Sequence, residues 1–338
     1  MKPIKKNFLV VGRGATAIYL ILRHHCDHQE VIVPSNICYA AILPIYYSGN
    51  TPRFIDVEYP SGNLSPSELL KTINPNTGAV IYPYMYGNVT PAIHEIKQIC
   101  QEHQLVLIED CASAMGATID NTPVGSFGDY AVFSTGHAKN VDLGNGGIVA
   151  SDPPLDNLMS AYQKLPVFTS QITNAQDSFS HQYSSFRHTH NQAKIKNLFA
   201  SRNDYKNLFL YQLNDPGLIQ KVENSFIDVE AEKETKLQKY NQFISKLPTN
   251  ICYSYNPGSF PWRFSILLNN SESKQKIIDD LLAEHLFVSD WYPCIAPFFD
   301  NTNQYPNSEK MAKEILNFTL TDSDENISRI CDIINSNI

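Results

Sequence analysis

The first half of the chain alternates between strand-like and helix-like segments, and this alternation restricts the possible folds more than any other feature. Short apolar runs predict buried strands, among them FLVV (8–11), EVIVPS (30–35) and LVLIED (105–110). ATAIYLILRHH (15–25) carries apolar residues at helical spacing and predicts a helix. The alternation predicts an α/β fold with a mostly parallel central sheet and helices on both faces. Ligands of such sheets bind at the carboxyl ends of the strands, so residues there are the first candidates for a functional site.

The second half of the chain has a weaker pattern and predicts a smaller second lobe. Residues 152–215 are polar and poorly periodic, which is compatible with loops, loosely packed helices or a lid. A long amphipathic helix is predicted over 222–247, and a strand and three further helices follow it, the second of them over 308–316. We therefore expect a large domain over 1–230 and a small C-terminal α+β domain over 231–338.

Charge and cysteine content exclude several classes of function. The formal net charge is −8 at pH 7, so the surface repels nucleic acid and anionic membranes, and neither is expected as a partner. No apolar segment is long enough to cross a bilayer. The 7 cysteines are odd in number, scattered and without CxxC spacing. This usage predicts reduced thiols in the cytoplasm and neither disulfides nor a metal site.

The segment VVGRGATA (10–17) lies between the first strand and the first helix and contains the pattern GxGxxA. The pattern suggests a nicotinamide dinucleotide site, but such a site needs an acidic residue at the end of the second strand. The second strand ends in PSN (34–36), which offers none. A simpler use remains, in which the backbone amides of Ala15 and Thr16 and the Thr16 hydroxyl bind a phosphate at the helix start. A tight strand-to-helix turn without a ligand is the alternative.

Two later strands also end in residues that could take part in catalysis or in ligand binding. Asp110 follows a buried strand, where it either caps a helix or pairs with a cation such as a protonated cofactor ring. Ser134 ends another strand and opens the stretch STGHAKNVDLGNGG (134–147), which contains Lys139. A lysine is usually solvated, but partial desolvation makes it a nucleophilic amine. A phosphate cup, a carboxylate and an amine, in this order, are what pyridoxal 5'-phosphate (PLP) requires.

The same segments resemble the DegT/DnrJ-type sugar aminotransferases, which are PLP enzymes of fold type I. RGATAI (13–18) resembles the family's SGTAAL, and EDCASAMGA (109–117) resembles EDAAQALGA. VGSFGDYAVFSTGHAKNVDLGNGG (124–147) resembles VGSFGDAAAFSFHPTKNLTTGEGG without a gap. The resemblance runs from Gly12 to the C-terminus, and it implies a PLP-dependent transferase fold of type I with a smaller C-terminal α+β lobe.

The resemblance implies a role for each matching position. Lys139 would bond to the cofactor and then carry the proton between substrate carbon and cofactor. Asp110 would pair with the pyridine nitrogen, and Ala112 would pack against one face of the ring. The positions that would contact the cofactor are Ala15, Thr16, Cys38, Asp110, Ala112, Ser113, Ser134, Lys139 and Asn203.

Several of these positions depart from the family pattern. Ser113 stands where the family has a glutamine, and Asn145 replaces a glutamate. Cys38 aligns with the aromatic residue that stacks on the ring, a place that Tyr39 could take only if the backbone shifts. The segment that reaches the neighbouring subunit's phosphate has only RNDYK (202–206) as a counterpart, with Asn203 as the reaching residue. The departures predict a retained cofactor site and a rebuilt sugar pocket.

The implied reaction is amino transfer from an amino acid, usually glutamate, through PLP and pyridoxamine phosphate (PMP) to a keto-sugar that is usually nucleotide-linked. Such a reaction belongs to amino-sugar or polysaccharide biosynthesis, and the family forms homodimers with shared active sites. A few relatives carry histidine in place of the lysine and act as dehydratases, whereas Lys139 favours amino transfer. Two alternatives remain open. One is a family member without turnover that binds PLP or another ligand as a regulatory or scaffold protein. The other is a nicotinamide oxidoreductase, which rests on GxGxxA alone.

Overall fold

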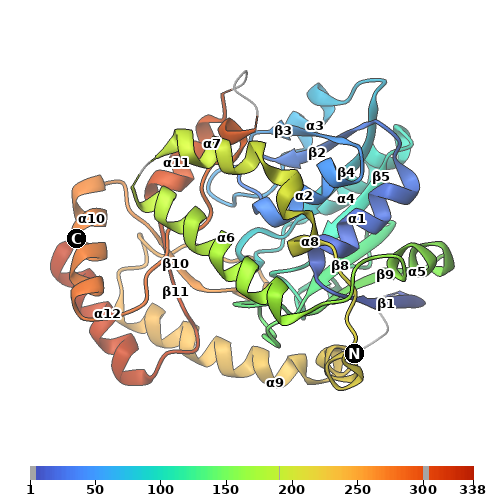
Figure 1. The fold of residues 1–338 in the computed structure, drawn as a ribbon. Coiled ribbons are helices and arrows are strands. Elements are labelled where there is room, and N and C mark those ends of the chain that lie inside the picture. Colours follow the sequence, from blue (N-terminus) through green and yellow to red (C-terminus); the bar gives the residue numbers. More distant parts are fainter. Residues whose placement is uncertain (1–4, 190, 300–303) are drawn as a thin grey trace.

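A seven-stranded sheet forms the centre of the protein (Figure 1). The structure, a computed structural model, describes residues 5–189, 191–299 and 304–338. The strand order is β1-β9-β8-β5-β4-β2-β3, and β9 alone runs antiparallel to its neighbours in this sheet. This confirms the predicted mostly parallel sheet. Its strands are β1 (Asn7–Val11), β2 (Glu30–Pro34), β3 (Thr51–Ile55), β4 (Thr77–Pro83), β5 (Val106–Asp110), β8 (Tyr130–Ser134) and β9 (Gly147–Ser151).

Helices cover both faces of the sheet because the strands are apolar on both sides. In β2, Val31 and Val33 pack with α1 (Gly14–His25) and α2 (Tyr39–Tyr47), whereas Ile32 points to the opposite core. That second core is covered by α3 (Pro66–Thr72), α4 (Ala92–Glu102) and the first half of α9 (Pro216–Lys246). Alternate side chains of one strand thus enter two cores, as the period of a strand requires. Short elements join the layers: η1 (Met85–Gly87), β6 (Thr118–Ile119), β7 (Thr122–Pro123) and η3 (Ala296–Phe298).

The polar segment 152–215 folds into helices. These are α5 (Asp156–Tyr162), α6 (Ser170–His188), α7 (Gln192–Ala200), η2 (Arg202–Tyr205) and α8 (Lys206–Phe209). A few large side chains, such as Phe179, Tyr183 and Phe199, anchor them in the core that also contains α1 and α2. Of the three predicted possibilities, the structure therefore selects helices packed on the large sheet. The periodicity was weak because only a few positions in each helix are apolar.

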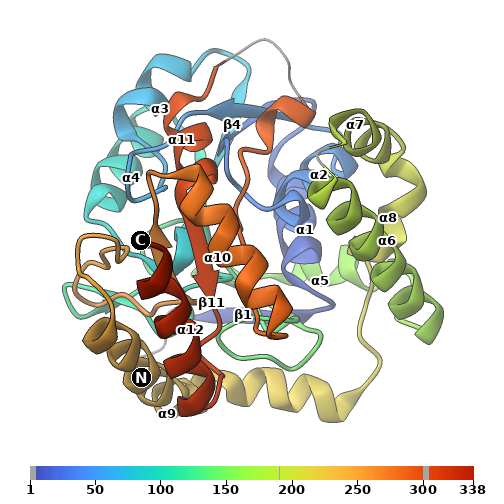
Figure 2. The same ribbon diagram turned by 90° about the vertical axis from the view of Figure 1, so that its left-hand side faces the viewer.

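The C-terminal lobe contains a second, two-stranded sheet of β10 (Phe264–Leu267) and β11 (Ile315–Phe318). The helices α10 (Ser271–Ala283) and α12 (Asp324–Asn337) and the second half of α9 cover it (Figure 2). The helix predicted over 308–316 is wrong at its end, because α11 (Pro306–Glu314) stops before Ile315. Ile315 and the next residue pair with β10 and belong to β11 instead.

Helix α9 passes through residue 230 without a break and links the two lobes (Figure 1). Its early residues Val222 and Val229 pack with the large sheet, whereas Phe243 packs on β10 and β11. The division into 1–230 and 231–338 would cut this helix, and it stays a prediction. Within the described residues, no helix combines the length and the apolar character needed to cross a bilayer.

Candidate active site

Segments that follow the carboxyl ends of four strands bring charged and nucleophilic side chains together. Arg13 follows β1, Cys38 follows β2, Asp110 ends β5 and Lys139 follows β8. The charges on Cys38, Asp110 and Arg13 all act on the pKa of Lys139, so the four groups lie within electrostatic range of one another. The parallel direction of these strands explains the gathering, since their carboxyl ends meet at one edge of the sheet.

The start of α1 lies against the end of β8. A Cβ atom added to Gly14 would lie 3.8 Å from Ser134 Oγ. Ser134 Oγ itself accepts a hydrogen bond of 3.3 Å from the backbone N–H of Gly136. The first amides of α1, including those of Ala15 and Thr16, have no partner within the helix and are available to an anion. The structure therefore brings the predicted phosphate-binding amides and Ser134 together.

The Thr16 hydroxyl does not face this turn, so that part of the prediction is wrong. Thr16 is fully buried, and its Oγ1 donates a hydrogen bond of 2.8 Å to the carbonyl oxygen of Phe209. This hydrogen bond of the hydroxyl links α1 to α8. Only the backbone N–H of Thr16 therefore remains available to a ligand. This contact could not be predicted from the local sequence, because the partner lies 193 positions away.

Close backbone contact requires glycine where β9 meets the turn before α1. A Cβ atom on Gly147 would lie 2.4 Å from the carbonyl carbon of Arg13 and 2.6 Å from the nitrogen of Gly14. We expect Gly147→Ala to lower the free energy of unfolding by about 1–3 kcal/mol, because backbone atoms must move to admit the methyl group. The measurement is chemical denaturation of the apoprotein. Gly14→Ala is the matched control, since its added methyl group meets its nearest neighbour at an ordinary 3.5 Å.

The loop that carries Lys139 is held by several hydrogen bonds. Trp262 donates its Nε1–H to the carbonyl oxygen of Ala138 over 2.5 Å. Asp142 Oδ2 accepts the backbone N–H of Ala138 over 2.7 Å. Ala138 also has a φ of +59°, an uncommon conformation for a residue with a side chain. These contacts fix the backbone next to Lys139.

Lys139 is half-buried, and its surroundings favour the uncharged amine. Burial lowers the pKa of Lys139 from its ordinary value, because desolvation disfavours the ammonium form. Cys38 and Asp110 act in the opposite direction, whereas Arg263 and Arg13 lower the pKa further by charge repulsion. A larger fraction of the side chain is therefore nucleophilic at neutral pH than for a solvated lysine.

The lowered pKa of Lys139 predicts a pH-dependent effect of replacing it. Between this pKa and the unfolded value of about 10.4, the unfolded chain binds more protons than the folded chain. The free energy of unfolding of the wild type must therefore rise with pH over that interval. We expect the stability of apo Lys139→Met, relative to wild type, to be greatest near neutral pH and to decline toward pH 10. Urea denaturation at several pH values measures it, and a difference independent of pH would contradict the desolvated lysine.

The two carboxylates at the end of β5 have separate environments. Glu109 is fully buried and accepts hydrogen bonds from the Tyr84 hydroxyl (2.5 Å) and from three backbone N–H groups (2.6–2.8 Å). Asp110 is half-buried, and its Oδ1 accepts the N–H of Ala112 over 3.0 Å. Desolvation raises the pKa of Asp110, and the nearby Lys139 opposes that rise. Glu109 therefore holds the fold, while Asp110 faces the lysine.

The helix-capping alternative for Asp110 is wrong, because no helix follows it. Residues 112–116 form turns, and the bond from the Ala112 N–H closes a local turn. Ala112 is half-buried, next to the Asp110 carboxylate. The structure therefore leaves Asp110 and Ala112 at the edge of the sheet beside Lys139.

Cys38 and Ser113 also lie in this region. Cys38 is half-buried directly before α2, and desolvation raises the pKa of its thiol, with Lys139 acting against the rise. Ser113 is buried, and its side chain lies near the Tyr292 hydroxyl, where it acts against the rise that burial causes in the pKa of that hydroxyl. Tyr39, the suggested substitute for a stacking ring, packs instead among aromatic side chains of the core. The position next to Lys139 is thus left to Cys38.

Asn203 does not join these residues within the chain. It is exposed on η2, and the preceding Arg202 packs over the ring of Tyr46 at 4.1 Å. The hydroxyl of Tyr47 donates to the Arg202 carbonyl oxygen over 2.6 Å. Tyr46 and Tyr47 end α2, whereas Cys38 precedes its start, so about 12 Å of helix separates the two places.

Three residues near Lys139 were not predicted from the sequence. Arg13 stands beside the phosphate turn, and its Nη1 donates to the Leu208 carbonyl oxygen over 2.9 Å. Arg263 precedes β10. Tyr292 lies within electrostatic range of Cys38 and Asp110, which both raise the pKa of its hydroxyl. Arg263 had a signal, because it is the one charged residue in the strand-like run PWRFSILL (261–268). Tyr292, one of 18 tyrosines, had none.

The strand order overturns the nicotinamide alternative. A dinucleotide site of that type requires the glycine-rich turn to follow a central strand that neighbours the second strand. Here β1 lies at the edge of the sheet beside the antiparallel β9, and four strands separate it from β2. The GxGxxA turn therefore has a different purpose in this fold.

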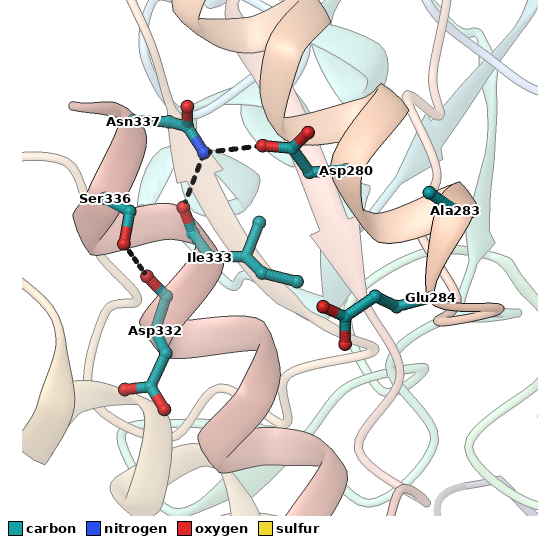
Figure 3. Close-up of a pocket in the computed structure, with 7 residues that line it drawn as sticks. All are labelled: Asp280, Ala283, Glu284, Asp332, Ile333, Ser336 and Asn337. Atoms are coloured by element: carbon teal, nitrogen blue, oxygen red, sulfur yellow. Dashed lines mark hydrogen bonds between the residues drawn. The ribbon is translucent and has the colours of Figure 1, made fainter.

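A cavity of about 320 Å³ lies elsewhere, between α10 and α12 of the C-terminal lobe (Figure 3). Two of its carboxylates already have partners, since Glu284 pairs with Arg329 and Asp280 accepts from Asn337 over 3.0 Å. None of the predicted site residues lines it. In the part of the chain that the structure describes, no cluster of three or more His, Cys, Asp or Glu side chains is arranged to hold a metal ion.

Comparisons with known proteins match both the sequence and the fold. Residues 4–201, more than half of the chain, match the model of the DegT/DnrJ/EryC1/StrS aminotransferase family. GDP-perosamine synthase from Vibrio cholerae is 35% identical over 149 residues, which are 44% of this chain and 40% of that protein. The chain thus matches less than half of the length of this curated relative.

Two solved structures share the fold. DesI in the presence of its TDP-sugar product matches 98% of this chain and 80% of its own, with a TM-score of 0.76 and 18% identity. GDP-4-keto-6-deoxy-D-mannose-3-dehydratase from E. coli with bound hydrated PLP matches 98% and 88%, with a TM-score of 0.72 and 16% identity. At these identities the likeness establishes the fold alone, and it confirms the predicted PLP-dependent transferase fold.

The segments that resemble the family have a common location in the molecule. RGATAI (13–18), EDCASAMGA (109–117) and the stretch 124–147 all lie inside the matched residues 4–201. The structure brings their key positions to one edge of the sheet, around Lys139. The chain belongs to the DegT/DnrJ/EryC1/StrS aminotransferase family.

Proposed function

We propose that this protein is a PLP-dependent aminotransferase that moves an amino group from an amino acid to a keto-sugar. The observation that carries the proposal is the meeting of Lys139 and Asp110 at the edge of the sheet where α1 begins. An amine of lowered pKa beside a carboxylate is the pair that amino-transfer chemistry on an aldehyde cofactor requires. Family membership supports the same reaction class.

The residues present fit PLP in their chemistry. The free amides of Ala15 and Thr16 and the Ser134 hydroxyl would hold the phosphate at the positive end of α1. Asp110 would face the pyridine nitrogen, and Lys139 would bond to the aldehyde carbon. When bound, PLP supplies an aldehyde that receives the amino group and a ring that takes up electrons from the reacting carbon.

The protein side chains would then control proton positions. Asp110 holds a proton on the pyridine nitrogen, because a carboxylate that is partly desolvated favours a cationic partner over water. Lys139 would take a proton from the substrate carbon and return it, as a general base and then a general acid. The uncharged amine needed for this step is the form that burial favours. Ala112 and Cys38 would lie against the ring, and Ser113 beside its hydroxyl.

The finer features of the proposal concern substrates and assembly. A nucleotide-linked keto-sugar as acceptor is supported by the names of the relatives, which refer to GDP and TDP sugars. Glutamate as donor, a role in amino-sugar or polysaccharide biosynthesis, a homodimer and a cytoplasmic location remain parts of the same proposal. In a homodimer, the exposed Asn203 would reach toward the partner's phosphate site. Asn145, which replaces the family's glutamate, is held by the hydroxyl of Tyr211 over 2.8 Å.

A single-turnover experiment tests the reaction. Purified protein is saturated with PLP and mixed with excess L-glutamate, and the absorbance of the cofactor bound to the lysine is followed. We expect that absorbance to convert to that of PMP, with one 2-oxoglutarate released for each site. Stable PLP binding without conversion by glutamate or any other amino acid would favour the regulatory or scaffold alternative. Failure to bind PLP at all would overturn the proposal.

A further inference from the structure

Arg263 is a cation of the C-terminal lobe that lies close to the lysine of the large domain. It directly follows Trp262, whose ring N–H bonds to the loop of Lys139 through the carbonyl oxygen of Ala138. The backbone N–H of Trp262 also donates to the carbonyl oxygen of Tyr86 over 2.9 Å. The position of Arg263 is therefore fixed against the large domain, and its charge acts on Lys139.

The guanidinium group of Arg263 lies over two aromatic rings, and in the described part of the chain it has no anionic partner. Its Cζ lies 4.0 Å from the ring centre of Trp262 and 4.8 Å from that of Phe287. Its Nη1 is buried and has no hydrogen-bond partner among the residues that the structure describes. Within the same residues, no Asp or Glu oxygen lies within 4 Å of it.

Such an arrangement is costly unless a ligand completes it. Desolvation lowers the pKa of Arg263 to about 10, a value at which the guanidinium still carries its charge at neutral pH. A buried cation with an unused N–H loses hydration without compensation. Elsewhere in the chain, Arg187 is also stacked on a ring, that of Trp291, but it pairs with Asp290 over 2.8 Å. Among the residues that the structure describes, Arg263 has no such partner, so we take an external anion as the missing component.

The nearby Lys139 narrows the choice of anion. The nitrogen of the amino donor proposed above would take the place of the Lys139 nitrogen on the cofactor, and the carbon of the donor's α-carboxylate is only two bonds from that nitrogen. A guanidinium group forms two parallel hydrogen bonds with a planar carboxylate, and stacked rings preserve the required orientation. In a nucleotide-linked sugar, the sugar ring would separate the phosphate from the reacting carbon. A nucleotide phosphate is therefore a poorer match than an α-carboxylate for a cation near Lys139.

We propose that Arg263 binds the α-carboxylate of the amino donor and so selects α-amino acids, an inference that rests on the proposed aminotransferase function. Trp262 and Phe287 position the guanidinium plane, and Nη1 donates to the carboxylate. Arg263 is thereby a specificity residue that touches the substrate, while Trp262 also links the donor site to the lysine loop.

The test compares Arg263→Gln and Arg263→Lys with wild type, all saturated with PLP. We expect Arg263→Gln to raise the concentration of L-glutamate needed for half-maximal conversion roughly 10–100-fold, as the loss of a hydrogen bond to a charged group implies. Arg263→Lys should recover part of the affinity. Conversion of 4-aminobutyrate, which lacks an α-carboxylate, should change little. Arg329→Gln is the matched control, since it removes one charge from the same lobe at an arginine already paired with Glu284.

Calorimetry supplies a second measurement that needs no turnover. The probes are glutarate, an unreactive dicarboxylate, and UDP, which carries phosphates without an amino acid. Weaker glutarate binding by Arg263→Gln with unchanged UDP binding supports the inference, whereas weaker UDP binding alone assigns Arg263 to a nucleotide and overturns it. Unchanged glutamate and glutarate binding in a variant that keeps PLP overturns the inference and leaves the aminotransferase intact. If wild type converts no amino donor, the proposed function fails, while glutarate binding still tests Arg263.

Discussion

Lys139→Ala is expected to abolish amino transfer while leaving the protein folded. The variant loses both the amine that bonds to the cofactor and the group that moves the proton, and the second role alone is worth about 10²–10⁴-fold in kcat. PLP should still bind through its phosphate and ring contacts, but borohydride should no longer attach it to the protein. The measurements are single-turnover absorbance with L-glutamate and the mass of the protein after borohydride treatment.

His137→Ala is the matched control for this experiment. His137 lies two positions before Lys139 in the same loop, but 92% of its side chain is exposed, and it only approaches Asp142 at 3.5 Å. Its removal should leave turnover and cofactor attachment within the error of the wild type. Attachment of PLP to the Lys139→Ala protein by borohydride would show that another amine bonds to the cofactor.

Asp110→Asn is expected to reduce kcat roughly 10²–10³-fold, the range found when a fixed electrostatic partner of the transition state is removed. An amide cannot hold the proton on the pyridine nitrogen, so the ring becomes a poorer electron sink. The bond from the Ala112 N–H to Oδ1 can be kept by the amide oxygen, so the fold should be preserved. Steady-state kinetics at saturating donor and thermal unfolding measure the two effects separately.

Glu109→Gln provides the contrast, because it changes the neighbouring carboxylate of the same strand. The Glu109 oxygens accept three backbone N–H groups and the Tyr84 hydroxyl, and an amide NH₂ would oppose some of these donors. We expect a loss of stability of about 1–3 kcal/mol with little change in kcat for the molecules that stay folded. Equal turnover in Asp110→Asn and wild type would contradict the role given to Asp110.

The fold of the large domain was largely predictable because its strands are buried on both faces. The predicted strands FLVV (8–11), EVIVPS (30–35) and LVLIED (105–110) correspond to β1, β2 and β5, and the strand that Ser134 ends corresponds to β8. Prediction was poorer where tertiary contacts decide the structure. In segment 152–215 the helices depend on a few anchors such as Phe179 and Tyr183. Ile315 and Leu316 fit a helical pattern but pair with β10, because a partner strand was available.

The site residues could be predicted where a reactive side chain lies in a short segment directly after a predicted strand. Lys139, Ser134 and Asp110 follow strands whose parallel direction brings their ends together. The Thr16 hydroxyl was misjudged because its partner, the carbonyl oxygen of Phe209, comes from a distant helix. Tyr39 likewise packs on Phe179 and Tyr183 of a distant helix, which the local sequence does not indicate. A side chain turns to whichever partner the packing offers, and that partner cannot be read from the local sequence.

The sequence by itself determined the order of strands and helices, the turn before α1 and the spacing from Ser134 to Lys139. These features depend on local periodicity, backbone freedom and residue type, all of which act over a few positions. Only the tertiary structure decided that Glu109 binds backbone N–H groups of the fold and that Asp110 lies within electrostatic range of Lys139. It also brought Arg263, 124 positions from Lys139 along the chain, to the same site, where no carboxylate in the described part of the chain pairs with it. Desolvation and charge depend on everything packed around a group, and most of those neighbours are remote in the chain.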